Sequence, residues 1–115
     1  MIPGKPSRGE IWYVDLDPGR GHEQTGRRPC LVVSVDSFNH GPAGLHVVLP
    51  MTTREKGIPF HIEAPSEETG LQQRGFIKCD DVRSVSRERF LKRLGGISAT
   101  TMDAVEYRLR ILMGL

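Results

Sequence analysis

Three clusters of polar residues in this sequence have the residue types that phosphate chemistry requires. They are the loop from Gly19 to Arg28, the segment Thr52-Thr53-Arg54 and the segment Lys78-Cys79-Asp80-Asp81. An arginine guanidinium can hold two phosphate oxygens at once, a threonine hydroxyl can donate to an oxyanion, and histidine or carboxylate groups can transfer protons. Composition alone leaves a second interpretation open for each cluster, which is an ordinary solvated surface loop.

The distribution of basic residues adds to this picture. Arg28 directly precedes Pro29, where the polar loop gives way to an apolar segment, and an arginine at such a junction is expected to be partly buried and paired. From Arg74 to Arg93 there are seven basic and three acidic residues, a local net charge of +4 against +2 for the whole chain. Such a stripe suits a nucleic acid backbone, although charge alone favours a solvated face that binds nothing.

Length and composition describe one ordinary globular domain. A chain of 115 residues with 37% hydrophobic and 26% charged residues fits a single domain over residues 1–115, with residues 1–8 as a flexible leader. The first ten residues lack the apolar core of a signal peptide, and no apolar run reaches membrane-spanning length, so we expect a cytoplasmic protein without a membrane partner. Cys30 and Cys79 lack CxxC spacing and lie in apolar runs, which predicts free core thiols, no metal site and no cofactor.

Hydrophobic patterning predicts about six short strands. The expected strands are residues 10–17, 29–35, 46–50, 59–64, 76–80 and 89–97, the last interrupted by Gly95-Gly96. Residues 10–17 and 59–64 alternate, and residues 29–35 are short, β-branched and bounded by turn residues. The connections are too short for βαβ crossovers, so the sheet is expected to be mostly antiparallel.

The C-terminal segment predicts a helix, because its apolar residues recur at three- and four-residue spacing. These residues are Met102, Val105, Leu109 and Leu112. Ser98 or Thr100 can cap the N-terminus of this helix, and Gly114 lies where it is expected to end. The fold class is therefore mainly β: a small, curled antiparallel barrel closed by a C-terminal helix.

Several motifs together resemble those of one family. The segment RGEIWYVDLDPGRGHEQTGRRPCLVVS follows the pattern GEIWxVDLDP, then GxEQxGxRP, then an apolar strand, and LPMTTREKGIPF and GFIKCDDVRSV continue the match. The sequence is similar to the MazF/PemK (Kid-like) family of RNA-cleaving toxins over residues 8–115. The combination of GxEQxGxRP, PxTT and CDxxRS at these spacings is specific, whereas any one of them alone is weak.

The resemblance implies an SH3-like barrel with a C-terminal helix, assembled as a homodimer. It implies the toxin of a type II toxin–antitoxin pair, which cleaves single-stranded RNA at short sequence motifs without a metal. The products would be a 2′,3′-cyclic phosphate and a 5′-hydroxyl. The implied partner is a MazE-like antitoxin whose extended, acidic tail blocks the site, and the toxin would bind DNA together with it.

The resemblance also implies roles for particular residues. Arg28 matches the arginine of GxRP and would clamp the phosphate, because an arginine is a poor general base. Thr52 would donate its hydroxyl to the same phosphate, and Glu23 would act as a base or hold Arg28 in place. His22 and Asp80 match residues implicated in the Kid-like branch as acid–base partners or stabilisers.

A further set of residues is expected to contact RNA along the same site. They are Arg20, Gln24, Arg27, Thr53, Arg54, Lys56, Lys78 and Arg83. Lys78 stands where the Kid-like branch has an arginine, so this position keeps the charge but loses the planar fork. Unstacked bases would also need stacking surfaces, for which Trp12, Tyr13, Phe38 and Phe60 are candidates, with core or dimer contacts as the alternative for Trp12 and Tyr13.

Two other functions remain open at this point. One is a non-enzymatic toxin of the same fold that poisons DNA gyrase, a relative that lacks the combination of GxEQxGxRP and PxTT. The other is a nucleic-acid-binding barrel without catalysis. Incubation with single-stranded RNA in EDTA separates the three hypotheses.

Overall fold

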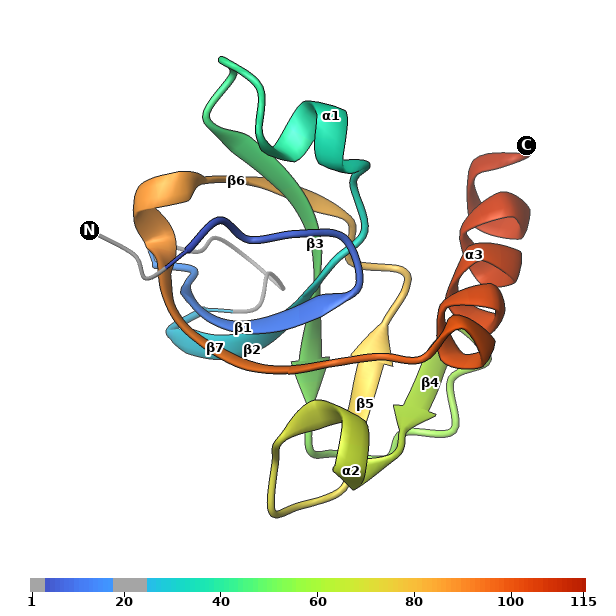
Figure 1. The fold of residues 1–115 in the computed structure, drawn as a ribbon. Coiled ribbons are helices and arrows are strands. Elements are labelled where there is room, and N and C mark those ends of the chain that lie inside the picture. Colours follow the sequence, from blue (N-terminus) through green and yellow to red (C-terminus); the bar gives the residue numbers. More distant parts are fainter. Residues whose placement is uncertain (1–3, 18–24) are drawn as a thin grey trace.

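The computed structural model describes residues 4–17 and 25–115, and its chain forms one curved sheet with a long C-terminal helix (Figure 1). The strands are β1 (Glu10–Asp15), β2 (Arg27–Val32), β3 (Leu45–Thr52), β4 (His61–Ala64), β5 (Gly75–Lys78), β6 (Arg83–Ser86) and β7 (Phe90–Gly96). The helices are α1 (Asp36–Asn39), α2 (Ser66–Thr69), the 3-10 turn η1 (Arg87–Arg89) and α3 (Ala99–Met113).

All strand pairs of the sheet are antiparallel, in the order β4-β5-β3-β2-β1-β7. β3 is shared between two partners on the same edge, because residues 45–48 pair with β6 and residues 51–52 pair with β5. This division lets the sheet curl round into a barrel while β4 and β5 extend away from it towards α3 (Figure 1). The predicted antiparallel barrel with a C-terminal helix is thereby confirmed.

The central strands bury apolar residues on both faces, which produces two cores. The barrel core consists of Trp12, Val14, Leu16, Cys30, Val32, Val48, Val85 and Phe90. The helix-side core consists of Ile11, Leu31, Val33, Leu49, Met51, Ala64, Ile77, Cys79, Met102 and Val105. Neighbouring residues of β1, β2 and β3 therefore point to opposite cores, as the two-residue period of a strand requires.

Helix α3 covers the helix-side core and lies beside β4 (Figure 1). Its N-cap is Ser98, whose side chain accepts a hydrogen bond from the Thr101 backbone N–H at 3.2 Å, and it ends at Gly114 in the left-handed conformation. The predicted cap and stop are confirmed. The predicted apolar face extends one position too far, because Leu112 near the helix end is 40% exposed. No helix in the described part of the chain is long and apolar enough to cross a membrane.

Four elements differ from the sequence prediction. The short helices α1 and α2 stand where loops were expected, and β6 is an additional strand. The predicted interruption of the last strand by Gly95-Gly96 is wrong, because β7 pairs with β1 through both glycines. A Cβ atom on Gly95 would lie 2.1 Å from the Glu68 carbonyl oxygen of α2, so glycine is required there for close packing between α2 and β7.

The described part of the leader is attached to the barrel. The Pro6 carbonyl lies 3.1 Å from Nε2 of the buried His46, and the Arg8 backbone N–H donates to Asp36 at 2.8 Å. The Arg8 guanidinium also donates to the Val33 carbonyl and to Glu106 of α3. Residues 6–8 thus connect the N-terminal end of the chain to β3, α1 and α3.

His46 makes the stability of the fold depend on pH. Its side chain is buried against Phe90, with ring centroids 4.8 Å apart, and Nδ1 has no hydrogen-bond partner among the described residues. Burial lowers the pKa of His46 below its ordinary value, with Arg87 and His40 adding to the shift, and Asp36 and the Pro6 hydrogen bond opposing it. Because the unfolded chain binds this proton more readily, we expect the free energy of unfolding to fall as pH drops below about 6.5.

The measurement is urea unfolding between about pH 5 and pH 7.5, where one such group contributes at most about 1.4 kcal/mol per pH unit. In His46→Gln this contribution to the slope disappears. Met113→Gln, which introduces the same side chain at an exposed, uncharged position of α3, serves as the control and keeps the wild-type slope. A wild-type slope in His46→Gln would contradict the assignment.

Candidate functional site

A groove of about 600 Å³ opens between the ends of β1, β2 and β3. Its described lining residues are Tyr13, Arg27, Arg28, Pro29, Met51, Thr52, Thr53, Arg54, Lys56 and Leu71. Four of these residues are cationic and none of them is acidic, so this part of the lining attracts anions. The structure brings together seven residues that the sequence singled out: Tyr13, Arg27, Arg28, Thr52, Thr53, Arg54 and Lys56.

The sheet register explains why Arg28 and Thr52 meet in this groove. In the β2–β3 ladder Cys30 pairs with Pro50 and Leu31 with Leu49. Arg28 and Thr52 each lie two residues beyond the last of these pairs, so each points to the same face of its strand as Cys30 or Pro50. Both residues line the groove.

Arg28 is exposed, so the prediction that it is partly buried is wrong. It lies at the open end of the barrel, opposite Val14 of β1, beyond the point where the core covers β2. Its Nε donates to the Thr25 carbonyl at 2.9 Å. Among residues 4–17 and 25–115, no hydrogen bond or ion pair engages Nη1 or Nη2, and these two atoms are the fork that would hold a phosphate.

The Thr52 hydroxyl is oriented by the turn that follows β3. Its Oγ1 accepts a hydrogen bond from the Arg54 backbone N–H at 3.2 Å, and the side chain is half-buried. The hydroxyl therefore closes a local turn, and it keeps its own proton to donate. Thr53, Arg54 and Lys56 follow on an exposed segment of the groove wall.

Lys78 and Arg83 are placed outside the groove lining and converge on one carboxylate. Nζ of Lys78 lies 3.5 Å from Asp81 Oδ2, and Nη2 of Arg83 lies 2.8 Å from the same atom. All three side chains are at most 21% exposed. This cluster links the end of β5 to the start of β6, so both cations carry a structural contact in addition to any contact with RNA.

Asp80 also lies outside the groove lining and faces a histidine. Its Oδ1 is 3.2 Å from Nε2 of His61, although the two atoms are not aligned as a hydrogen bond. The His61 side chain is 4% exposed and that of Asp80 is 38% exposed. Sequence reasoning missed His61, whose only signal was its place at an alternating position of a predicted strand.

Four predicted site residues fall outside the described residues. They are Arg20, His22, Glu23 and Gln24. The aromatic candidates divide clearly: Tyr13 lines the groove, whereas Trp12 lies in the barrel core with Phe90 against it edge-to-face at 5.9 Å. Phe60 packs against the helix-side core, and Phe38 lies on α1.

The cysteines form part of the cores and are not poised for chemistry. Both are free and buried, as predicted, and burial raises the pKa of each thiol to about 12. A thiol with such a pKa carries almost no thiolate at neutral pH, so it is a poor nucleophile. Within the described ranges, no three His, Cys, Asp or Glu side chains gather closely enough to hold a metal ion.

Comparison with known proteins identifies the family. Residues 7–113 match the model of the PemK-like, MazF-like toxin of type II toxin–antitoxin systems. The chain belongs to this toxin family. It is 36% identical to the endoribonuclease MazF9 of Mycobacterium tuberculosis over 113 residues, which are 94% of this chain and 96% of the relative.

Solved structures of MazF share the fold of this family member. A crystal structure of MazF from Deinococcus radiodurans matches with a TM-score of 0.87 and 33% identity, covering 98% of this chain and 100% of the other. A MazE–MazF structure from the same organism matches with a TM-score of 0.81 and 32% identity, covering 98% and 99%. The predicted resemblance to the MazF/PemK family is therefore confirmed.

In this MazF-like chain the groove contains three residues that sequence reasoning did not predict. Pro29, Met51 and Leu71 add apolar surface beside the four cationic residues, the two threonines and Tyr13. Pro29 and Met51 come from strands that carry predicted groove residues, but Leu71 arrives from the segment after α2. Only the closed sheet brings that segment to β1, so no local pattern could have indicated it.

Proposed function

We propose that this protein is the toxin of a type II toxin–antitoxin pair and acts as an endoribonuclease on single-stranded RNA. Membership of the PemK-like, MazF-like family supports the class of activity, and its relative MazF9 is named an endoribonuclease. The observation that carries the proposal for this chain is the cationic groove that both Arg28 and Thr52 line. Single-stranded RNA, whose bases can be unstacked, fits such an open groove better than a rigid duplex does.

The proposed reaction is attack by the ribose 2′-oxygen on the adjacent phosphorus. The 2′-O–P bond forms, the bond from phosphorus to the 5′-oxygen breaks, and the products are a 2′,3′-cyclic phosphate and a 5′-hydroxyl. One group takes the 2′-hydroxyl proton and another supplies a proton to the leaving oxygen. Negative charge accumulates on the non-bridging oxygens, where a preformed donor lowers the barrier most.

Arg28 and Thr52 are proposed as the donors to these oxygens. The guanidinium fork of Arg28 would hold two oxygens, and the Thr52 hydroxyl would donate to one of them. Glu23, His22 and Asp80 are the proposed proton carriers or stabilisers. The reaction as written needs no metal ion, and metal independence is part of the proposal.

The proposed assembly is a homodimer whose groove is blocked by an antitoxin with an extended acidic tail. The cationic lining suits such a tail for the same reason that it suits RNA. The match to a structure named MazE–MazF supports a MazE-like partner. We propose that the protein acts in the cytoplasm, where its RNA substrate is found, and binds DNA only together with the antitoxin.

The test is incubation of the purified protein with a long single-stranded RNA in EDTA, followed by mapping of both ends at every cut. We expect cleavage to persist in EDTA and to leave 5′-hydroxyl and cyclic phosphate ends. Adding a synthetic acidic peptide should inhibit cutting, whereas a neutral peptide of equal length should not. Intact RNA together with inhibition of gyrase, or RNA retention without cutting, would contradict the proposal.

A further inference from the structure

A second, smaller pocket lies beside the groove. It has a volume of about 160 Å³ and is formed by the segment after β3 and by strands β4 and β5. Its lining residues are Glu55, Lys56, Gly57, Ile58, His61, Glu63 and Phe76. Lys56 lines both the pocket and the groove, so a chain whose phosphate lies in the groove can reach the pocket with its neighbouring group.

A buried histidine in the pocket wall has an unsatisfied nitrogen among the described residues. The His61 side chain is 4% exposed, and its Nδ1 has no hydrogen-bond partner in the described part of the chain. A buried nitrogen in this state costs free energy that a ligand can recover. In the neutral tautomer with the proton on Nε2, which faces Asp80 at 3.2 Å, Nδ1 is a hydrogen-bond acceptor.

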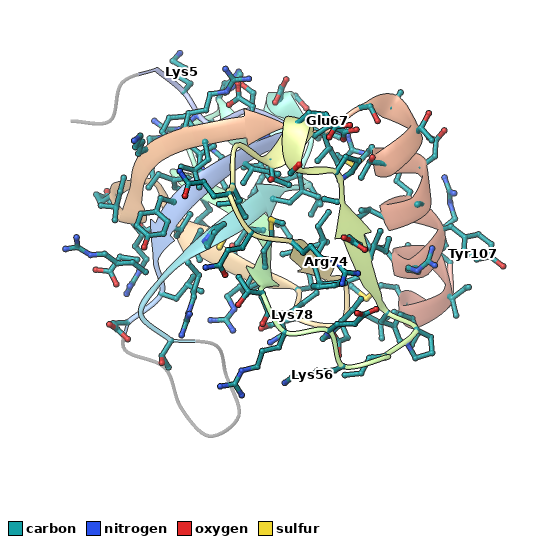
Figure 2. The ribbon with its side chains drawn as sticks, turned by 90° about the horizontal axis from the view of Figure 1, so that it is seen from below. Lys5, Lys56, Glu67, Arg74, Lys78 and Tyr107 are labelled. Carbon is teal, nitrogen blue, oxygen red and sulfur yellow. The ribbon has the colours of Figure 1, made fainter. Side chains whose placement is uncertain are left out.

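Two carboxylates add further acceptors. Arg74 donates two hydrogen bonds to the Glu63 carboxylate, from Nε at 2.7 Å and from Nη2 at 2.8 Å. Its Nη1 lies 3.4 Å from Glu55 Oε1, and its guanidinium carbon lies 5.3 Å from the centroid of the Phe76 ring. Hydrogen bonding from Arg74 lowers the pKa of Glu63, so this carboxyl is ionised and can only accept. Figure 2 shows Arg74 near the centre of the view, with Lys56 below it and Glu67 above it.

We propose that this pocket is a base subsite of the RNA groove, specific for a base with an exocyclic amino group. The inference rests on the proposed function and adds the substrate feature that the pocket reads. A flat ring can enter a space of this size, with Phe76 as an apolar wall. The amino groups of adenine, cytosine and guanine are donors that match His61 Nδ1 and the carboxylates, whereas uracil would turn carbonyl oxygens towards them.

The neighbouring cation fixes where this base lies relative to the cut. Lys56 would bind the phosphate that joins the base in the pocket to the nucleotide in the groove. The subsite therefore reads the position immediately next to the cut phosphate, on one side only. The base in the pocket supplies sequence preference, and the groove supplies cleavage.

The experiment maps cleavage of an RNA pool randomised around the cut by wild type, Glu63→Gln and His61→Phe. Wild type is expected to prefer amino-bearing bases over uracil at one adjacent position, and each variant should lower that preference about 10-fold. Glu67→Gln, the same change at an exposed position of α2, is the matched control and should keep the wild-type preference. Circular dichroism checks folding, and Glu63→Gln decides the result if buried His61→Phe unfolds.

Unchanged preference in a folded Glu63→Gln variant would overturn the subsite, as would a wild type that cuts without preference at both adjacent positions. If the wild-type protein does not cut RNA, the proposed function is overturned, and a binding measurement tests the subsite instead. That measurement uses short 2′-O-methyl RNAs that carry adenine, cytosine or uracil at one position. Tighter binding of adenine and cytosine than of uracil, lost in Glu63→Gln, supports the subsite, and equal affinities overturn it.

Discussion

Arg28→Ala is expected to abolish most RNA cutting while the protein stays folded. The guanidinium lies at the open end of the barrel, and none of the described contacts engages its terminal nitrogens, so its removal disturbs little structure. Loss of one preorganised donor to a developing oxyanion reduces the rate on the order of 100-fold or more. The measurement is the single-turnover rate on a short RNA with one cut site, with thermal unfolding as the check on folding.

Two further variants define what Arg28 does. Arg28→Lys keeps the charge without the planar fork, so we expect a rate between those of wild type and Arg28→Ala. Combining Arg28→Ala with Thr52→Val should cost less than the two separate losses together, because both donors serve one phosphate. Arg110→Ala, which removes an exposed arginine from α3, is the control for loss of charge. Wild-type cutting by Arg28→Ala would show that the phosphate clamp is wrongly assigned.

Gly95→Ala is expected to destabilise the fold more than any other single added methyl group on β7. The new Cβ would lie 2.1 Å from the Glu68 carbonyl oxygen and 2.8 Å from the Thr69 carbonyl carbon, and both are backbone atoms that cannot rotate away. Either α2 moves or β7 leaves its register with β1, at a cost of about 3 kcal/mol. Urea unfolding at neutral pH measures the loss.

The adjacent glycine supplies the control for this prediction. A Cβ on Gly96 would lie 3.4 Å from Nη2 of Arg93, the end of a flexible side chain that can move aside. Gly96→Ala should therefore cost much less than Gly95→Ala. Equal losses in the two variants would mean that the contact between α2 and β7 does not determine the choice of glycine.

The strands that alternate or run apolar were predictable, and the short elements were not. β1 carries enough β-branched and aromatic residues to show its period, β2 ends in the apolar run Cys30–Val32, and Ser98 and Gly114 mark the ends of α3. A helix of four residues such as α1 has no period to detect. β6 buries only Val85 in the barrel core, so nothing in its sequence distinguishes it from a loop.

The candidate site was predictable where its residues lie on neighbouring strand ends. Arg28 and Thr52 follow from motifs whose spacing matches a family, and both line the groove beyond the paired part of β2 and β3. His61 could not be predicted, because its significance comes from burial next to Asp80, and burial depends on the closed sheet. Arg28 was wrongly predicted to be partly buried for a related reason. Strand β2 begins at Arg27, but its buried residues begin only at Cys30.

Both cores take side chains from the same three strands, β1, β2 and β3, and this determines how the domain unfolds. Ile11 and Trp12 are neighbours in β1 but belong to opposite cores, and so do Leu49 and Val48 in β3. Unfolding of one core would remove the strands that carry the apolar side chains of the other core. The domain is therefore expected to unfold as a single cooperative unit. A protease would then find no long-lived intermediate to trim, and the toxin would persist intact or be degraded whole.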